Sequence, residues 1–279
     1  MGFGCNAAGV VGCRIIDSER ERLLAVITNS LVPCNGRFPT LISIITMFFI
    51  GTQTKTLTSL TSALFLTALI LAGIGFTFLS TFILSKTVLK GVPSSFTLEL
   101  PPYRKPQIGK VIVRSVFDRT LFVLGRAAAV AAPAGIIIYL AANITVGDAS
   151  ILKICSDFLD PFARLMGLDG VILIAFILGF PANEIVIPIV IMAYTASGVL
   201  SDTGNLTAVK ELFVSNGWNM TTAMCTMIFS LFHWPCSTTV LTIKKETQSI
   251  KWTVISVLLP TLLGILCCML VAFVMKFVC

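Results

Sequence analysis

Long runs of apolar residues, separated by short polar stretches, recur along the whole chain. The runs at 57–85, 120–144 and 252–278 are each long enough for a helix to cross a bilayer, since about 20 residues span the hydrocarbon core. A shorter run covers 38–53, and another covers 221–243. The pattern predicts an all-α integral membrane protein, a polytopic helical bundle with about five full spans.

The distribution of charge predicts which face is cytoplasmic. The connection at 86–119 carries seven basic and two acidic residues, which places it on the cytoplasmic side. If the run at 168–198 were one crossing, the basic residues within 244–251 would lie on the opposite face. The conflict disappears if this run enters the membrane and returns on the outer side.

Two prolines, Pro181 and Pro188, support this interpretation of the run at 168–198. We expect limbs at 170–180 and 184–194, each about 16 Å long as a helix and therefore about half a bilayer. Broken helices are tolerated only where protein or a water-filled cavity surrounds them. The fold therefore includes a re-entrant or discontinuous pair.

Composition identifies lipid as the main solvent of the chain. Of its 279 residues, 56% are hydrophobic and 12% are charged, and the mean hydropathy is +0.96. That charged fraction is about half of the usual share for soluble domains. The net charge of +7 therefore indicates contact with anionic lipid headgroups and no role in binding nucleic acid.

Short motifs recur in the two halves of the chain. Residues 2–6 (GFGCN) resemble 179–183 (GFPAN), and 32–34 (VPC) resemble 234–236 (WPC) in the same order. Corresponding breaks in two repeats indicate a binding site near the membrane midplane. The motifs predict two gate-type repeats; chance recurrence of glycine, phenylalanine and proline is the alternative.

Three of the nine cysteines lie where helices are expected to break. Cys34 and Cys236 each follow a proline, which frees backbone carbonyls by removing a donor, and Cys5 lies in a glycine-rich segment. A thiolate and several oxygens can converge at such a break. The alternative is that buried cysteine serves only as a small apolar residue, which we favour for Cys267 and Cys268.

His233 and Glu184 are the other candidate ligands. The single histidine stands three residues before Cys236, so the two would share a helix face, although a lone histidine is often only a hydrogen-bonded interior group. Glu184 lies inside an apolar run, where an ionisable group is costly and indicates function. The alternatives to a ligand role for Glu184 are an interfacial position or an ion pair with Arg37 or Arg126. Arg37 itself is expected to anchor the start of a span.

No phosphate-binding loop of the form G-x-x-x-x-G-K-[ST] occurs, and one histidine leaves no H-E-x-x-H or Ser-His-Asp arrangement. The sequence therefore predicts a protein that is not itself an enzyme.

Seven segments together resemble the gate motifs of the ferrous iron transport protein B (FeoB) family. The likeness runs in order along essentially the whole chain. The first gate corresponds to GFGCN at 2–6, DSERERLL at 17–24 and PCNGRFP at 33–39; the second gate and the cysteine-bearing helix after it correspond to GLDG at 167–170, GFPANEI at 179–185, PC at 235–236 and KKET at 244–247.

The resemblance implies inward transport of Fe²⁺ in bacteria by a multi-pass protein of the cytoplasmic (inner) membrane, with pore-lining cysteines. Fe²⁺ would be the transported ion, and no bound cofactor is expected. The expected ion pathway comprises Cys5, Cys34, Cys236, Glu184, His233 and Asn6. Gating or structural roles are expected for Pro33, Arg37, Pro181, Asn183 and Pro235.

The expected organisation is a first gate repeat with its following span at 1–85, a basic cytoplasmic loop at 86–119 and a second gate repeat with C-terminal spans at 120–279. The family carries a GTP-binding domain before its gate motif, whereas here Met1 directly precedes that motif. We therefore expect the GTP-binding domain on a missing upstream segment or on another chain. Assembly into a homo-oligomer stays open.

Two other functions remain open on the sequence. A gate-domain transporter of a nucleoside or another small solute would place hydrogen-bonding side chains, not thiols, at the breaks. A non-transporting membrane scaffold that assembles with a separate GTPase would support no metal flux.

Overall fold

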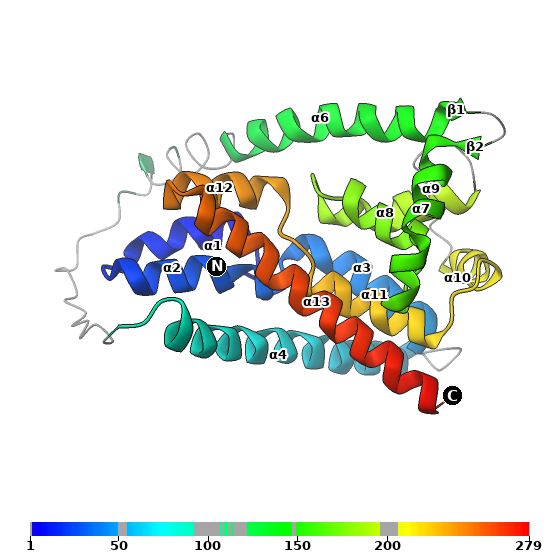
Figure 1. Cartoon of the computed structure of the whole chain (residues 1–279), viewed down its shortest axis with the longest axis horizontal. Helices are drawn as coiled ribbons and strands as arrows, with labels where there is room; N and C mark the ends of the chain where they lie inside the picture. Colours follow the sequence, from blue (N-terminus) through cyan, green and yellow to red (C-terminus); the bar gives the residue numbers. More distant parts are fainter. Residues whose placement is uncertain are drawn as a thin grey trace.

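A computed structural model of the chain describes residues 2–49, 55–91, 107, 109–110, 113, 122–146, 149–195 and 206–278. Helices make up most of this part of the chain (Figure 1). Two strands of two residues each, β1 (Thr145–Val146) and β2 (Ala149–Ser150), pair antiparallel. The expected all-α fold is confirmed, with this strand pair as a small addition.

In the described part of the first half, short helices precede one long helix, α4. Its elements are α1 (Asn6–Gly12), η1 (Cys13–Ile15), α2 (Glu19–Thr28), η2 (Asn29–Leu31), η3 (Asn35–Arg37), α3 (Phe38–Ile44), the π-helical turn η4 (Ile45–Phe49) and α4 (Lys55–Thr87).

The second half contains more helices. Its elements are α6 (Phe122–Asn143), α7 (Ile151–Leu165), α8 (Gly170–Leu178), η6 (Asn183–Ile185), α9 (Val186–Thr195), α10 (Leu206–Ser215), α11 (Met220–Phe232), α12 (Ser237–Thr247) and α13 (Ile250–Val278).

Two described helices are long and apolar enough to cross a membrane: Leu60–Thr87 within α4 and Ile250–Phe277 within α13. A third crossing is added if the pair α7 and α8, bent by 108°, forms one span. Both long helices and α6 coincide with apolar runs expected from the sequence. The apolar helices identify a membrane protein. Most of the basic connection at 86–119 lies outside the described residues.

The discontinuous pair expected around 168–198 is present. Helix α8 ends at Leu178, the chain turns through 179–182, and η6 continues into α9, which packs against α8. The limbs are close to the expected half-length, because Pro181 cannot donate a backbone hydrogen bond and the following residues restart the helix.

The apolar run at 221–243 is divided, where we expected one span. Helix α11 ends at Phe232 and α12 begins at Ser237. Pro235 lies between them and removes a helical donor. The break therefore places four residues, His233 to Cys236, in extended or irregular backbone instead of helix.

The sharp bend between α7 and α8 depends on close backbone packing. A methyl group placed on Gly170 would lie 2.0 Å from the carbonyl oxygen of Ser156. Only glycine allows this approach. Asp169 begins α8 by accepting a hydrogen bond from the backbone N–H of Ile172 at 2.6 Å.

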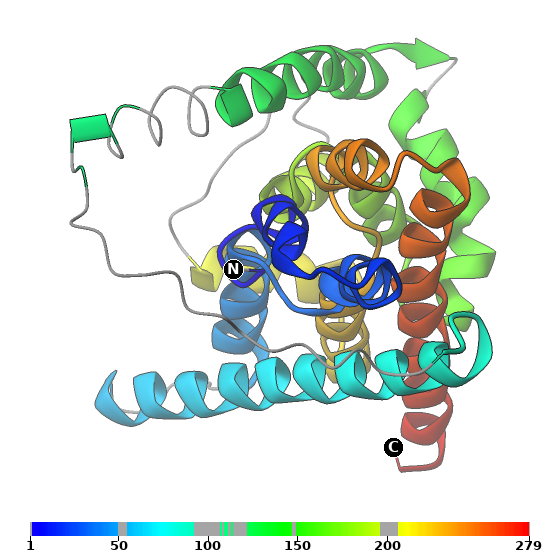
Figure 2. The same ribbon diagram turned by 90° about the vertical axis from the view of Figure 1, so that its left-hand side faces the viewer.

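Helices from the first and last parts of the chain pack against one another. Helix α1 packs on α12, α2 on α13, and α11 on both α3 and α13. In both views these helices lie between α4 and α6, except that the C-terminal end of α13 extends past α4 (Figures 1 and 2). The largest apolar core, with Phe176 and Phe229 in edge-to-face contact, joins α8 to α11.

Candidate functional site

The two expected gates meet at the centre of the bundle. The short helix η3, which follows Cys34, packs against η6 in the break between α8 and α9. Helix α11 also packs against α3. The broken segments of both halves therefore share one region.

Each half joins its two motifs by a similar backbone hydrogen bond. The N–H of Asn35, next to Cys34, donates to the carbonyl of Gly4 at 3.3 Å. The N–H of Ser237, next to Cys236, donates to the carbonyl of Phe180 at 2.9 Å. The residue after each Pro-Cys pair thus bonds to the glycine-phenylalanine motif of its own half, which supports the proposed duplication.

The Arg37 side chain forms hydrogen bonds with both halves of the chain. The side chain is fully buried at 0% exposure, and its NH1 donates to the carbonyls of Ser30 (3.0 Å) and Leu231 (2.7 Å). Its NH2 donates to the carbonyls of His233 (2.9 Å) and Trp234 (3.4 Å). Carbonyls freed at the end of α11 receive donors from this guanidinium.

His233 is buried, and both ring nitrogens have protein neighbours. Nδ1 donates to the carbonyls of Phe229 (3.1 Å) and Ser230 (2.9 Å), and Nε2 lies 3.3 Å from Oδ1 of Asn183. The ring therefore joins α11 to η6. In this arrangement both ring nitrogens face oxygen atoms of the protein.

The three cysteines at helix breaks differ in exposure. Cys34 is buried, Cys236 is half-buried with its Sγ 3.3 Å from the hydroxyl of Thr239, and Cys5 is exposed where it precedes α1. Arg37 follows Cys34 by three residues, and its guanidinium donates to the carbonyl of Trp234, two residues before Cys236. The structure thus brings Cys34 and Cys236 around one guanidinium.

Glu184 reaches the same region from the second half. A methyl group placed on Gly36 would lie 3.5 Å from Glu184 Oε2 and 4.0 Å from Cys34 Sγ. The Glu184 side chain is exposed, and it makes no hydrogen bond or ion pair with any described residue. The ion pair with Arg37 that the sequence left open does not form.

The remaining expected residues occupy the breaks. Asn6 is buried at the start of α1; its carbonyl accepts from the side chain of Asn29 at 2.8 Å, while its Oδ1 has no partner among the described residues. Pro33, Pro181 and Pro235 lie in the gaps between helices.

Within the described ranges, no three His, Cys, Asp or Glu side chains lie close enough to hold a metal ion together.

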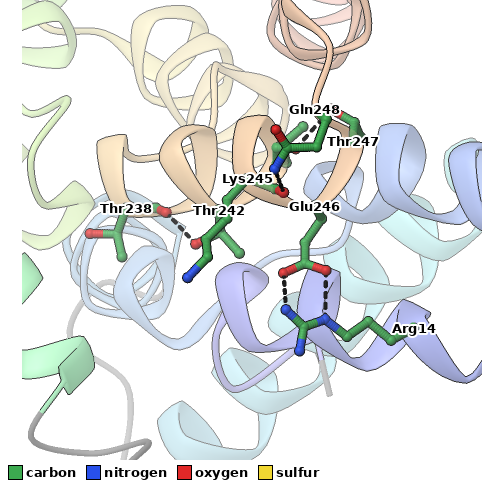
Figure 3. A network of polar contacts seen from close by, with 8 residues as sticks. Arg14, Thr238, Thr242, Lys245, Glu246, Thr247 and Gln248 are labelled. Carbon is green, nitrogen blue, oxygen red and sulfur yellow. Dashed lines mark hydrogen bonds and ion pairs between the residues drawn. The ribbon is translucent and has the colours of Figure 1, made fainter.

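Sequence reasoning missed an ion pair that joins the two ends of the chain. The Arg14 guanidinium makes two parallel bonds of 2.6 Å to the carboxylate of Glu246, from η1 to the end of α12 (Figure 3). Burial and the Glu246 charge both raise the pKa of the neighbouring Cys13 thiol. No sequence signal links positions so far apart.

A second missed feature lies at the start of α8. Asp169 accepts a hydrogen bond from the hydroxyl of Tyr194, which in turn accepts one from the Trp218 indole at 2.7 Å. The position of Asp169 directly before an apolar run is the usual signal of a helix cap. The network joins α8, α9 and the start of α11.

Comparisons with known proteins cover most of the chain. The family model described as "Ferrous iron transport protein B C terminus" matches residues 66–119, and the Gate model, "Nucleoside recognition", matches 122–250. The chain is 28% identical over 271 residues to the Fe(2+) transporter FeoB of Staphylococcus aureus, covering 93% of this chain and 37% of that protein.

Relatives from other organisms also match most of the chain. The Fe(2+) transporter FeoB of Leptospira interrogans is 25% identical over 269 residues, and that of Methanocaldococcus jannaschii is 26% identical over 271 residues. These matches cover 89% and 92% of this chain, and 38% of each relative. No solved structure matches the chain significantly.

The chain thus spans less than two fifths of the length of these relatives. Both matching models and all three relatives agree with the resemblance drawn from the gate motifs. The chain is thus similar over 89–93% of its length to Fe(2+) transporter FeoB proteins, and it matches the ferrous iron transport protein B C-terminal model and the Gate model.

Proposed function

We propose that this chain is the permeation module of a transporter that carries Fe²⁺ into bacterial cells across the cytoplasmic membrane. The observation that carries the proposal is the meeting of both Pro-Cys breaks around Arg37, with Glu184 beside Cys34. Thiolate and carboxylate ligands favour a borderline transition metal over Mg²⁺. The names of the relatives support iron as that metal.

The proposed path runs between the two halves, with the first gate in 1–85 and the second in 120–279. Cys34 and Cys236 replace part of the hydration shell of the ion. Cys5 lies at the exposed end of the first gate and receives or releases the ion. His233 and Asn183 enter the path only if the contact between them opens.

The proposed module is not an enzyme and uses a GTP-binding domain located elsewhere, either upstream in a longer protein or on a separate chain. The basic connection at 86–119 is proposed to lie on the cytoplasmic face, where such a domain would bind.

Cellular uptake of radioactive Fe²⁺ tests the proposal, with Cys34→Ser and Cys236→Ser compared with wild type at equal membrane abundance. Serine keeps the size of the side chain and removes the soft ligand, so uptake should fall strongly. The matched control is Cys155→Ser, because Cys155 is exposed on α7, away from both breaks. Unchanged uptake in both gate variants would refute a thiol-lined path.

A nucleoside transporter is a second candidate, favoured by the description of the family model that matches 122–250. It predicts saturable nucleoside uptake that Cys34→Ser leaves intact. A non-transporting scaffold predicts no Fe²⁺ flux after reconstitution together with its GTP-binding partner.

A further inference from the structure

Helix α7 runs across the direction of the helices beside it. It is bent by 108° relative to α8, and Figure 1 shows it crossing the direction of both α8 and α11. In the same view α7 lies toward the end of the molecule that holds α10 and the end of α13. The basic last turn of α12, with Lys244 and Lys245, lies at the opposite end. Helix α7 therefore lies where one surface of the bilayer is expected.

Two faces of α7 are accounted for by protein and by charge. Leu152, Ser156 and Ala163 are separated by one or two helical turns and are buried, and α7 packs on α8. The next face around the helix carries all four charged residues of α7, which are Lys153, Asp157, Asp160 and Arg164. Arg164 and Asp160 form an ion pair one turn apart on this polar face.

The third face of α7 is apolar and exposed. It consists of Ile154, Phe158, Phe162 and Leu165, which follow one another at three or four residues and therefore lie along one side of the helix. Phe158, at the centre of this face, is 83% exposed. An exposed apolar face beside a separate charged face is typical of a helix that lies in the plane of a membrane interface.

A polar hollow shows which side of α7 faces water. The hollow has a volume of about 290 Å³, and its lining includes Arg164 from the polar face of α7. Asp169, Asn216, Asn219 and Thr222 complete the polar part of the lining. Polar groups that line an open space are costly to place in hydrocarbon. The polar face of α7 therefore points to water, and the apolar face, turned away from the hollow, points to lipid.

We propose that α7 lies in the bilayer surface opposite the basic end of α12, with its apolar face among the upper parts of the phospholipid acyl chains. Its charged face lies among the headgroups and water. If α7 crossed the membrane instead, Lys153, Asp157 and Arg164 would lie at hydrocarbon depth, where ionisable groups are costly. The inference goes beyond the proposed function and does not depend on which solute the protein carries.

The contact with lipid has a consequence for the second gate. Asp160 accepts a hydrogen bond at 3.1 Å from the backbone N–H of Gly170, the first residue of α8. Helix α8 then leads directly into the break at 179–182. The position of α7 at the lipid surface therefore sets the depth at which α8 begins, and with it the depth of the break.

Tryptophan fluorescence of the purified full chain in phosphatidylcholine vesicles tests the inference. Phe158→Trp places a reporter at the centre of the apolar face, and subtraction of the wild-type spectrum removes the emission of the three native tryptophans. Bromine atoms quench tryptophan on contact, so lipids brominated at different points along the acyl chain report depth. The added emission should be blue-shifted, and bromine close to the ester groups should quench it more than bromine close to the chain ends.

The matched control is Asp157→Trp, one residue away on the charged face. Its added emission should resemble that of an indole in water, and aqueous iodide should quench it whereas brominated lipid should not. Phe162→Trp gives a second reporter on the apolar face and should behave as Phe158→Trp does. Elution of each variant at the wild-type volume in size-exclusion chromatography shows that the fold is intact.

Three results would overturn the inference. Quenching of both apolar-face reporters by iodide but not by brominated lipid would place this face in water. Quenching by neither agent would show that protein covers the face. Stronger quenching by bromine near the chain ends would place α7 at the depth of a spanning helix. None of these measurements involves Fe²⁺, so each result leaves the proposed function to its own uptake assay.

Discussion

Replacement of Arg37 by methionine should destabilise the protein more than any other single loss of charge described above. Methionine is close to arginine in length and fills the apolar part of the space, but it has no donors. Four backbone carbonyls lose their N–H partners, three of them within 3.0 Å of the guanidinium. Two elements, η2 and the end of α11, lose their connection.

The magnitude follows from the number of carbonyls left without a donor. Each buried acceptor without a partner costs about 1–3 kcal/mol. Three short bonds therefore correspond to about 3–9 kcal/mol, and because methionine avoids the cost of burying a charge, the expected value lies in the lower part of that range. We expect a net loss of about 3–5 kcal/mol. At about 2–4 °C per kcal/mol, the apparent Tm should fall by about 6–20 °C.

Heating of the detergent-solubilised protein followed by size-exclusion chromatography measures this fall as loss of the monodisperse peak. Arg164→Met is the control, because Arg164 is highly exposed and its ion pair with Asp160 lies on the surface. Such exposed pairs contribute little to stability, because solvent screens them. Arg37→Lys should lie between the two variants, since an ammonium donates to carbonyls but lacks the guanidinium fork. Equal Tm values for Arg37→Met and Arg164→Met would refute the reasoning.

Three further predictions concern the ends of the bundle and the bend at α8. Burial and the Glu246 charge raise the pKa of Cys13, so Glu246→Gln should lower that pKa. Maleimide should then label Cys13 faster at a fixed pH near 8, as measured by mass spectrometry. An unchanged pH profile of labelling would show that the Glu246 charge does not act on the thiol. Gly170→Ala should lower stability by about 1–3 kcal/mol or more, because its methyl would overlap the Ser156 carbonyl. A normal Tm would contradict the close packing. Asp169→Asn keeps a helix cap but weakens the hydrogen bond from the Tyr194 hydroxyl, so it should lower stability by about 1–2 kcal/mol. Asp169→Ala removes the cap as well and should lower stability more, as measured by the same thermal assay.

The positions of the helix breaks could be predicted from the sequence because their cause is local. Pro181 and Pro235 cannot donate within a helix, and an apolar run that contains a carboxylate cannot lie in lipid throughout. The discontinuous pair and the locations of Cys34 and Cys236 followed from these rules. The division of 221–243 into two helices should have followed from the same proline, but its hydropathy resembled that of one span.

The contacts between the breaks could not be predicted because they join positions far apart. Arg37 was expected to anchor a span at the membrane surface, where an arginine without a carboxylate partner is normally solvated. It is buried because α11 ends beside it and supplies carbonyls from 194 to 197 positions later in the chain. His233 likewise had the appearance of a ligand, and only the approach of Asn183 occupies its second nitrogen.

The hydrogen bonds that Arg37 makes to later residues also have a consequence for the order in which the protein folds. Three of its four carbonyl partners belong to residues made 194 or more positions after it. At about 5–20 residues per second, the ribosome reaches them about 10–40 s after it has added Arg37. During that interval the guanidinium lacks these three carbonyl acceptors, so we expect it to stay at the membrane interface. The first gate can therefore be completed only after α11 has been made, although its own sequence precedes α11 by almost 200 residues.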